Sequence, residues 1–252
     1  MAASNTTHPE IVSSEEWLKA RKGLLAREKE FTRLRDELNA ERRKLPIVEI
    51  RKPYVFEGSS GKATLPELFE GRRQLIVYHF MLDPAHEEGC PGCSHLADNM
   101  PHLSHIHARD TTLVMVSRAP IAKITAFKTR MGWTVPWYSS YGTDFNYDFH
   151  VSLDEERGSV EWNYQSAAAL QKAGQIPYTK GELPGVSVFL RDGGRTFHTY
   201  STYARGLDML INVYHYLDLT PFGRGEGWDG MPDLGGQGQR WLRHHDRYGV
   251  QS

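Results

Sequence analysis

The chain has 252 residues and a formal net charge of −1, and its 39% hydrophobic and 24% charged residues are typical of a globular protein, so we expect neither nucleic acid nor a membrane as a partner. Residues 1–10 lack the features of a secretion signal, and no segment approaches the roughly 18 apolar residues of a membrane span. Two cysteines are too few for a secreted disulfide framework, which leads us to expect a cytoplasmic protein.

The first predicted element is a long helix from Ser13 to Leu45. Ser13 and Glu16 have the spacing of a capping box, and Pro46 ends the helix. Charged residues cover most of its surface, and its apolar residues form one stripe with a seven-residue repeat: Trp17, Leu24, Phe31, Leu38 and Leu45, joined by Leu34. Such a stripe needs a partner surface. We favour packing on the rest of the chain, and the alternative is a helix pair with a second copy in a homodimer.

A predicted sheet begins after this helix. Residues 47–56 alternate as in a strand, and the turn at 58–61 closes an entry hairpin. A short helix signal runs from Pro66 to Phe69, and the apolar run 75–82 indicates a buried strand.

The sequence Gly89-Cys90-Pro91-Gly92-Cys93-Ser94, the CPGC turn, follows the buried strand and holds both cysteines of the chain. A helix is predicted over 94–108, a strand over 111–117, and a second helix from Pro120 to about Met131. Strands separated by helices favour parallel pairing, so this part of the sheet is predicted to be parallel.

Residues 133–150 form an insertion rich in aromatic side chains. We favour the interpretation that it covers the sheet. It is also able to wall a substrate pocket, and Trp137 and Tyr141 are then the candidate substrate-binding residues.

The last predicted elements are antiparallel. Strands at 186–190 and 196–200 flank an Asp-Gly-Gly turn and form a hairpin, and a helix over 207–217 closes the domain. The sheet is therefore predicted to be mixed. Residues 219–252 are rich in glycine and indicate an irregular arm, whose tryptophans would dock it onto the domain or onto a partner subunit.

The order strand, CPGC, helix, strand, helix, hairpin and final helix resembles the thioredoxin fold over residues 54–218. The chain more closely resembles the bacterial thioredoxin-like family catalogued as domain of unknown function 899, on the stretches SSEEWLKARK, TRLRDELNAERRKLP, YVFEG, YGTDFNYDF and PGVSVFLRDGGRTFHTYSTYARGLDMLINVYHYLDLTP. This resemblance implies a three-layer α/β, peroxiredoxin-related fold with a mixed central sheet flanked by helices. We divide the chain into a helical extension (13–46), a thioredoxin-like domain (47–218) and a C-terminal arm (219–252).

The spacing and position of the two cysteines predict thiol–disulfide exchange. Cys90 lies at a helix start, where free N–H groups favour a thiolate, so we assign it as the nucleophile and Cys93 as the resolving thiol. Because carboxylates oppose a thiolate, Asp83, Glu87 and Glu88 are expected to cancel part of this effect and leave Cys90 without strong activation. The expected partner is a thiol or disulfide substrate, protein or small molecule, and no cofactor is expected.

The resemblance to the thioredoxin fold also implies a role for Leu183 and Pro184. A proline before the third core strand of that fold lies beside the disulfide with a cis peptide bond, and Pro184 occupies the matching place. We therefore expect a cis Leu183-Pro184 bond that faces the CPGC turn, with Pro184 a catalytic residue and the Leu183 backbone binding the substrate.

Three alternatives to exchange stay open. A peroxidase is less supported, because the peroxiredoxin pattern needs Pro and a hydroxyl residue seven and three positions before its cysteine, where Cys90 has Asp83 and Glu87. A protein with a vestigial CxxC that acts as an adaptor is a second alternative. Metal binding by the cysteines with nearby histidines is the third, for copper or zinc, although we assign no metal ligand. Among the histidines, His79 is best placed to modulate the cysteines, unless strand alternation directs it to the far face.

Overall fold

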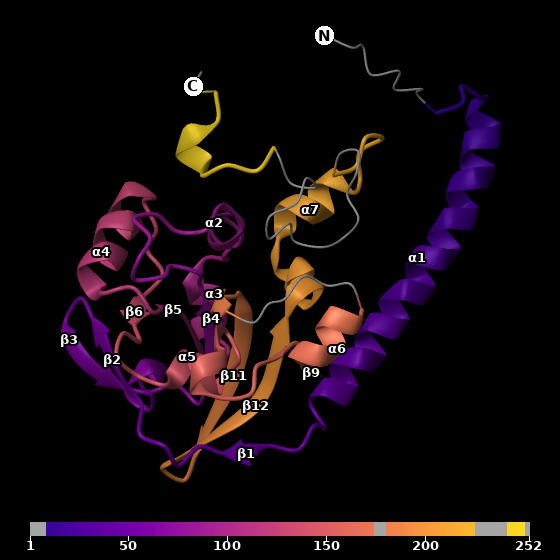
Figure 1. Ribbon diagram of the computed structural model, residues 1–252. Helices are drawn as coiled ribbons and strands as arrows, with labels where there is room; N and C mark the ends of the chain where they lie inside the picture. Colours follow the sequence, from indigo (N-terminus) through magenta and orange to yellow (C-terminus); the bar gives the residue numbers. More distant parts are fainter. Residues whose placement is uncertain (1–8, 174–179, 225–240, 250–252) are drawn as a thin grey trace.

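A computed structural model describes residues 9–173, 180–224 and 241–249 (Figure 1). Its centre is an eight-stranded sheet in the order β1-β12-β11-β4-β5-β6-β2-β3. Strands β4, β5 and β6 are parallel, and the other neighbouring pairs are antiparallel. The bounds are β1 Val48–Glu49, β2 Val55–Gly58, β3 Gly61–Thr64, β4 Gln74–His79, β5 Thr111–Ser117, β6 Trp137–Ser139, β11 Gly185–Asp192 and β12 Arg195–Tyr203.

The helices and short strands complete the predicted three layers. The α-helices are α1 Ser14–Arg42, α2 Pro91–Asp98, α3 Leu103–His107, α4 Ile121–Arg130, α5 Phe145–Asp148, α6 Ala167–Lys172 and α7 Asn212–Leu217. The 3-10 helices are η1 Glu67–Phe69, η2 Glu155–Arg157, η3 Ala204–Leu210 and η4 His245–Arg247. Two small sheets pair β7 Ser152–Asp154 with β10 Lys180–Glu182, and β8 Glu161–Trp162 with β9 Gln165–Ser166.

The core lies on both faces of the sheet because side chains alternate along each buried strand. On β4, Tyr78 faces a cluster that contains Cys93 of α2 and Phe127 of α4. Its neighbour Val77 faces a second cluster, which contains Phe145 of α5. The thioredoxin-like α/β architecture expected from the sequence is therefore confirmed, with the cysteines on the face that α2 and α4 cover.

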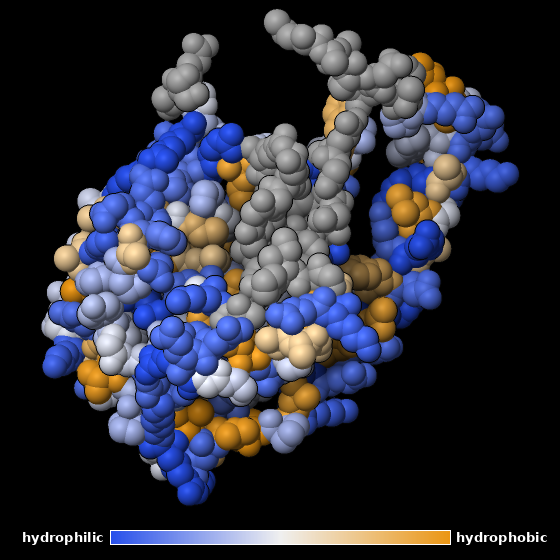
Figure 2. Space-filling view, viewed as in Figure 1, coloured by the Kyte–Doolittle hydropathy of each residue, from blue (hydrophilic) through white to orange (hydrophobic). Residues whose placement is uncertain are grey.

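The N-terminal helix is confirmed, and its expected packing is wrong. Ser13 and Glu16 form the complete capping box. No residue of α1 is buried, and Trp17 and Phe31 are 59% and 65% exposed, so the stripe does not pack on the rest of the chain. The helix extends along one side of the molecule (Figure 1), and apolar residues stand among charged ones on its surface (Figure 2). At the end of the helix, the Arg42 guanidinium lies 4.9 Å from the centre of the Tyr200 ring.

Two other helix predictions need correction. The helix expected over 94–108 is two helices, α2 and α3, because Pro101 lacks an N–H and its ring clashes with a continuous helix. The helix expected over 207–217 begins as the 3-10 helix η3 and becomes α-helical only at Asn212. No helix among the described residues is long and apolar enough to cross a membrane.

Candidate functional site

The CPGC turn connects the end of β4 to the start of α2. Cys90 is the N-cap residue of α2, and Pro91 occupies the first turn, where its missing N–H costs nothing. The Cys90 N–H donates to the carbonyl of Met81 at 3.1 Å, which holds the turn against the chain leaving β4. The Ser94 N–H donates to the Cys90 carbonyl at 2.9 Å and starts the helix.

Cys90 is the activated thiol of the pair. Its side chain is half-buried, and both cysteines are free thiols. A hydrogen bond from the Cys93 side chain lowers the pKa of Cys90 to about 7, against the opposing effect of burial. The backbone N–H groups of Cys93 and Gly92 contribute to the same lowering of the pKa, as expected at the start of a helix. Much of Cys90 is therefore thiolate near neutral pH.

Cys93 has the opposite character. It is 2% exposed, and burial is the main reason why its pKa lies well above the usual thiol value, with the neighbouring Cys90 as a second cause. Hydrogen bonds from Tyr78 and from the Met81 N–H, which lies 3.4 Å from Sγ, partly offset this rise. Cys93 therefore holds its proton while Cys90 gives its proton up, as the assigned roles require.

Tyr78 is a site residue that the sequence reasoning missed. Its side chain is fully buried, and its own pKa is raised by burial and by the two cysteines. The alternation of β4 directs Tyr78 to the face that α2 covers, so the signal was present in the strand pattern. The same alternation directs His79 to the opposite face, where its Nε2 lies 2.9 Å from Ser187 Oγ.

The acidic residues before the turn do not suppress the Cys90 thiolate. Glu87 pairs with Lys123 at 2.8 Å, and Glu88 pairs with Arg130 at 2.7 Å. Because these cations neutralise the carboxylates, neither glutamate contributes to the pKa of Cys90. Our expectation of a weakly activated Cys90 is corrected on this point.

The expected cis bond at Pro184 is wrong, because no peptide bond among the described residues is cis. The Leu183 N–H donates to the Val151 carbonyl at 2.8 Å, and Gly185 already pairs with His79 of β4. The chain thus approaches β11 in an extended path that a trans bond permits, and trans is favoured by about 0.5–1 kcal/mol. Val186, the second residue of β11, packs in the same cluster as Cys93. The roles of Leu183 and Pro184 in the chemistry stay predictions.

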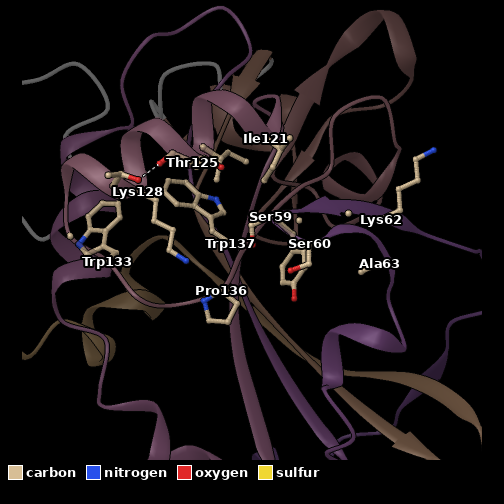
Figure 3. A pocket seen from close by; sticks show the side chains of 16 residues that line it. Ser59, Ser60, Lys62, Ala63, Ile121, Thr125, Lys128, Trp133, Pro136 and Trp137 are labelled. Carbon is tan, nitrogen blue, oxygen red and sulfur yellow. Dashed lines mark hydrogen bonds between the residues drawn. The ribbon is translucent and has the colours of Figure 1, made fainter.

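The aromatic segment 133–150 partly forms the sheet, since Trp137 begins β6, and Phe145 and Phe149 cover one face of the sheet, as we favoured. Trp137 is 4% exposed, and its Nε1 donates to Ser117 Oγ at 3.0 Å. It also lines a groove of about 520 Å³ between α4 and the β2–β3 turn, and Lys128 and Trp133 are among the other residues that line it (Figure 3). Tyr141 is 59% exposed and does not line this groove, so the structure does not bring together the two predicted substrate-binding residues.

Metal binding finds no support in the geometry. Within the ranges that the structure describes, no group of three or more His, Cys, Asp or Glu residues is arranged to hold a metal ion. His95, next to the motif, packs against Tyr214 and Trp241 and not against the sulfur atoms.

Comparison with known proteins gives the family. A family model described as a bacterial protein of unknown function, DUF899, matches residues 6–248, and the chain therefore belongs to this family. No curated protein matches the chain.

Similar solved structures include a PrxQ mutant of Xylella fastidiosa, 14% identical with a TM-score of 0.39, covering 66% of this chain and 89% of that one. Peroxiredoxin Q of Xanthomonas campestris is 15% identical with a TM-score of 0.40, covering 64% and 85%. Reduced 2-Cys peroxiredoxin of Plasmodium vivax is 14% identical with a TM-score of 0.39, covering 68% and 94%. Similarities this distant do not define the activity of this chain.

Proposed function

We propose that this protein is a thiol–disulfide oxidoreductase that uses Cys90 and Cys93. The observation that carries this proposal is the contrast between the two thiols, one half-buried with a pKa of about 7 and the other buried with a raised pKa. An attacking thiol is most effective when its pKa lies near the ambient pH. The resolving thiol must stay protonated until the mixed disulfide has formed.

The proposed reaction reduces a disulfide substrate in two steps. The Cys90 thiolate attacks one substrate sulfur, which breaks the substrate disulfide, forms a mixed disulfide and releases the other sulfur as a thiolate. Cys93 then loses its proton to that leaving group and attacks Cys90 Sγ, which releases the second substrate thiolate. The net change is two electrons from the protein to the substrate, and a cellular dithiol reductant must restore the Cys90 and Cys93 thiols.

Two features of the site support exchange over peroxide reduction. Asp83 and Glu87 stand where the peroxiredoxin pattern has proline and a hydroxyl group, and Glu87 is 2.8 Å from Lys123 in an ion pair. Cys90 and Cys93 are in direct contact within one turn, so the resolving step needs no unfolding of the helix. The proposed substrate is a protein or small-molecule disulfide in a reducing compartment.

Turnover of a disulfide substrate tests the proposal. Reduced protein should reduce insulin or an aromatic disulfide with dithiothreitol as the final reductant. Cys90→Ser should abolish turnover, whereas Cys93→Ser should complete one attack and accumulate a mixed disulfide on Cys90. If either serine variant turned over the disulfide as fast as the wild type, the proposal would be overturned. Faster consumption of hydrogen peroxide than of disulfide would favour the peroxidase alternative.

A further inference from the structure

The described end of the C-terminal arm, residues 241–249, lies near α2 (Figure 1) and contacts Gly89, the residue before the CPGC turn. Its central contact is made by His244, which is 3% exposed and whose Nε2 lies 2.8 Å from the carbonyl oxygen of Gly89. Gly89 immediately precedes Cys90. The contact therefore joins positions 155 residues apart in the chain and ends on the peptide bond that carries the Cys90 N–H.

The surroundings of His244 fix the orientation of its ring. A carbonyl oxygen only accepts, so Nε2 must carry the hydrogen of this bond. Nδ1 lies 3.4 Å from Nη2 of Arg130 and 3.8 Å from Oε2 of Glu88. The ring packs edge-on against Phe127, with the ring centres 5.4 Å apart. His244 is thus held with its Nε2 donor directed at Gly89.

Gly89 lies close to two aromatic rings. A Cβ atom there would lie 2.5 Å from Phe80 and 2.8 Å from Phe127, so this position has no room for a side chain. The same peptide group donates the Cys90 N–H to the Met81 carbonyl at 3.1 Å. The N–H of Met81 in turn lies 3.4 Å from the Cys93 sulfur.

Ion pairs surround this buried hydrogen bond. Arg130 binds Asp246 at 2.7 Å and Glu88 at 2.7 Å, and Glu88 also binds Arg247. These side chains are between about a quarter and a half exposed, so each pair adds little stability. The buried bond of His244 is the stronger constraint, because its loss leaves the Gly89 carbonyl without that partner.

We propose that His244 is a positioning residue for the redox site, holding Gly89 so that the Gly92 and Cys93 N–H groups stay directed at Cys90 Sγ. The proposal rests on the function proposed above. It predicts that a free C-terminal arm lowers the thiolate fraction of Cys90, since the turn would then sample arrangements in which the stabilising N–H groups point elsewhere. His244 does not touch the sulfur atoms and acts through the backbone alone.

Two substitutions of His244 separate the hydrogen bond from packing. His244→Phe keeps a ring against Phe127 and removes the donor, whereas His244→Gln keeps an N–H donor at similar reach and removes the ring. The readout is the pH dependence of Cys90 alkylation by iodoacetamide in the full-length reduced protein, followed by peptide mapping. We expect His244→Phe to lower the rate at pH 7 by about threefold or more and to raise the apparent pKa, and His244→Gln to stay within about twofold of wild type.

A second pair of variants covers the case in which His244→Phe does not fold. Leu242→Ala removes a buried side chain of the arm without changing a charge and should lower the rate in the same direction, while Lys128→Gln removes a charge from α4 without touching the arm and should leave it unchanged. An unchanged Cys90 pKa in every folded variant of the arm would overturn the proposal. Because alkylation needs no turnover, this result is distinct from failure of the wild type to reduce disulfides, which would overturn the proposed function alone.

Discussion

At the scale of single residues, the site depends on the different surroundings of two thiol groups, those of Cys90 and Cys93. Cys90 and Cys93 are three positions apart, but one receives N–H groups at a helix start and the other lies in the core beside Tyr78. The position of Cys90 at the start of a helix was predictable from the sequence, and the roles of the two thiols stay predictions. The ion pairs of Glu87 and Glu88 were not, because Lys123 and Arg130 lie 36 and 42 residues further along the chain.

The pKa of Cys90 predicts its alkylation profile. Because the thiolate is the reactive form and the pKa is about 7, the rate should rise about tenfold per pH unit in acid and level off above neutral pH. Cys93 should react far more slowly throughout this range. Alkylation followed by peptide mapping measures both rates. A Cys90 profile that continues to rise up to pH 9 would contradict the account of the N–H contacts.

Tyr78 predicts an effect on the second step of exchange. Its hydrogen bond lowers the pKa of Cys93, so Tyr78→Phe should raise that pKa further and slow the attack of Cys93 on Cys90. We expect the mixed disulfide to persist several times longer, while the first attack by Cys90 is little changed. Quenched-flow mass spectrometry resolves the two steps. An effect confined to the first step would show that Tyr78 acts on Cys90 instead.

At the scale of elements, strong patterns gave correct predictions and long-range packing did not follow from them. The capping box of α1, the turn at 58–61, β5 and the β11–β12 hairpin formed where expected, because each has a local signal. The strand expected over 47–56 is wrong, because this stretch is divided into β1, which pairs with β12, and β2, which pairs with β3 toward the other edge of the sheet. Pro101 is also a local signal, because a proline interrupts a helix, and it marks the break between α2 and α3. The exposed position of α1 was not predictable, since a periodic stripe does not specify its partner.

The stripe of α1 predicts a homodimer. With the stripe exposed along the described helix, a second copy is the partner we propose for it. Phe31→Glu with Leu38→Glu should convert the dimer to a monomer in analytical ultracentrifugation without changing the melting temperature. The matched control is Lys22→Glu, a charge reversal outside the stripe. A wild-type protein that stays monomeric at high micromolar concentration would rule out this pairing.

The ion pair between Glu182 of β10 and Arg118, which follows β5, predicts an effect on the free energy of unfolding. Glu182 is buried, its carboxylate accepts from Ser152 at 2.7 and 2.8 Å, and it pairs with Arg118 at 2.8 Å. Burial raises the pKa of Glu182, so the carboxylate depends on these partners. Arg118→Met should therefore reduce the free energy of unfolding by about 2–3 kcal/mol at neutral pH.

The pH dependence separates this effect from simple loss of packing. A protonated Glu182 needs no counter-charge, so the loss should shrink as the pH falls through the raised pKa of Glu182. Glu182→Gln combined with Arg118→Met is the control, and it should show no such dependence. Urea denaturation at several pH values measures all three proteins, and a pH-independent loss in the single variant would contradict a charged Glu182.

At the scale of the whole molecule, the fold was predictable from the sequence, and the docking of the C-terminal arm beside the CPGC turn was not. The order of strands and helices specifies the thioredoxin-like arrangement, because parallel strands around a crossover helix leave few topologies. The docking of His244 on Gly89 has no periodic or spacing signal in a glycine-rich arm. The trans bond at Pro184 likewise follows from contacts of the preceding segment with Val151. The domain boundaries proposed from the sequence stay predictions.

The most direct test of the central claim is a redox titration of the purified protein in glutathione buffers, with thiols trapped in acid and mapped by mass spectrometry. The account predicts one two-electron transition, in which a single Cys90–Cys93 disulfide forms within one chain. A glutathione adduct that persists on Cys90, a disulfide between chains, or two thiols that resist oxidation at every potential would contradict it.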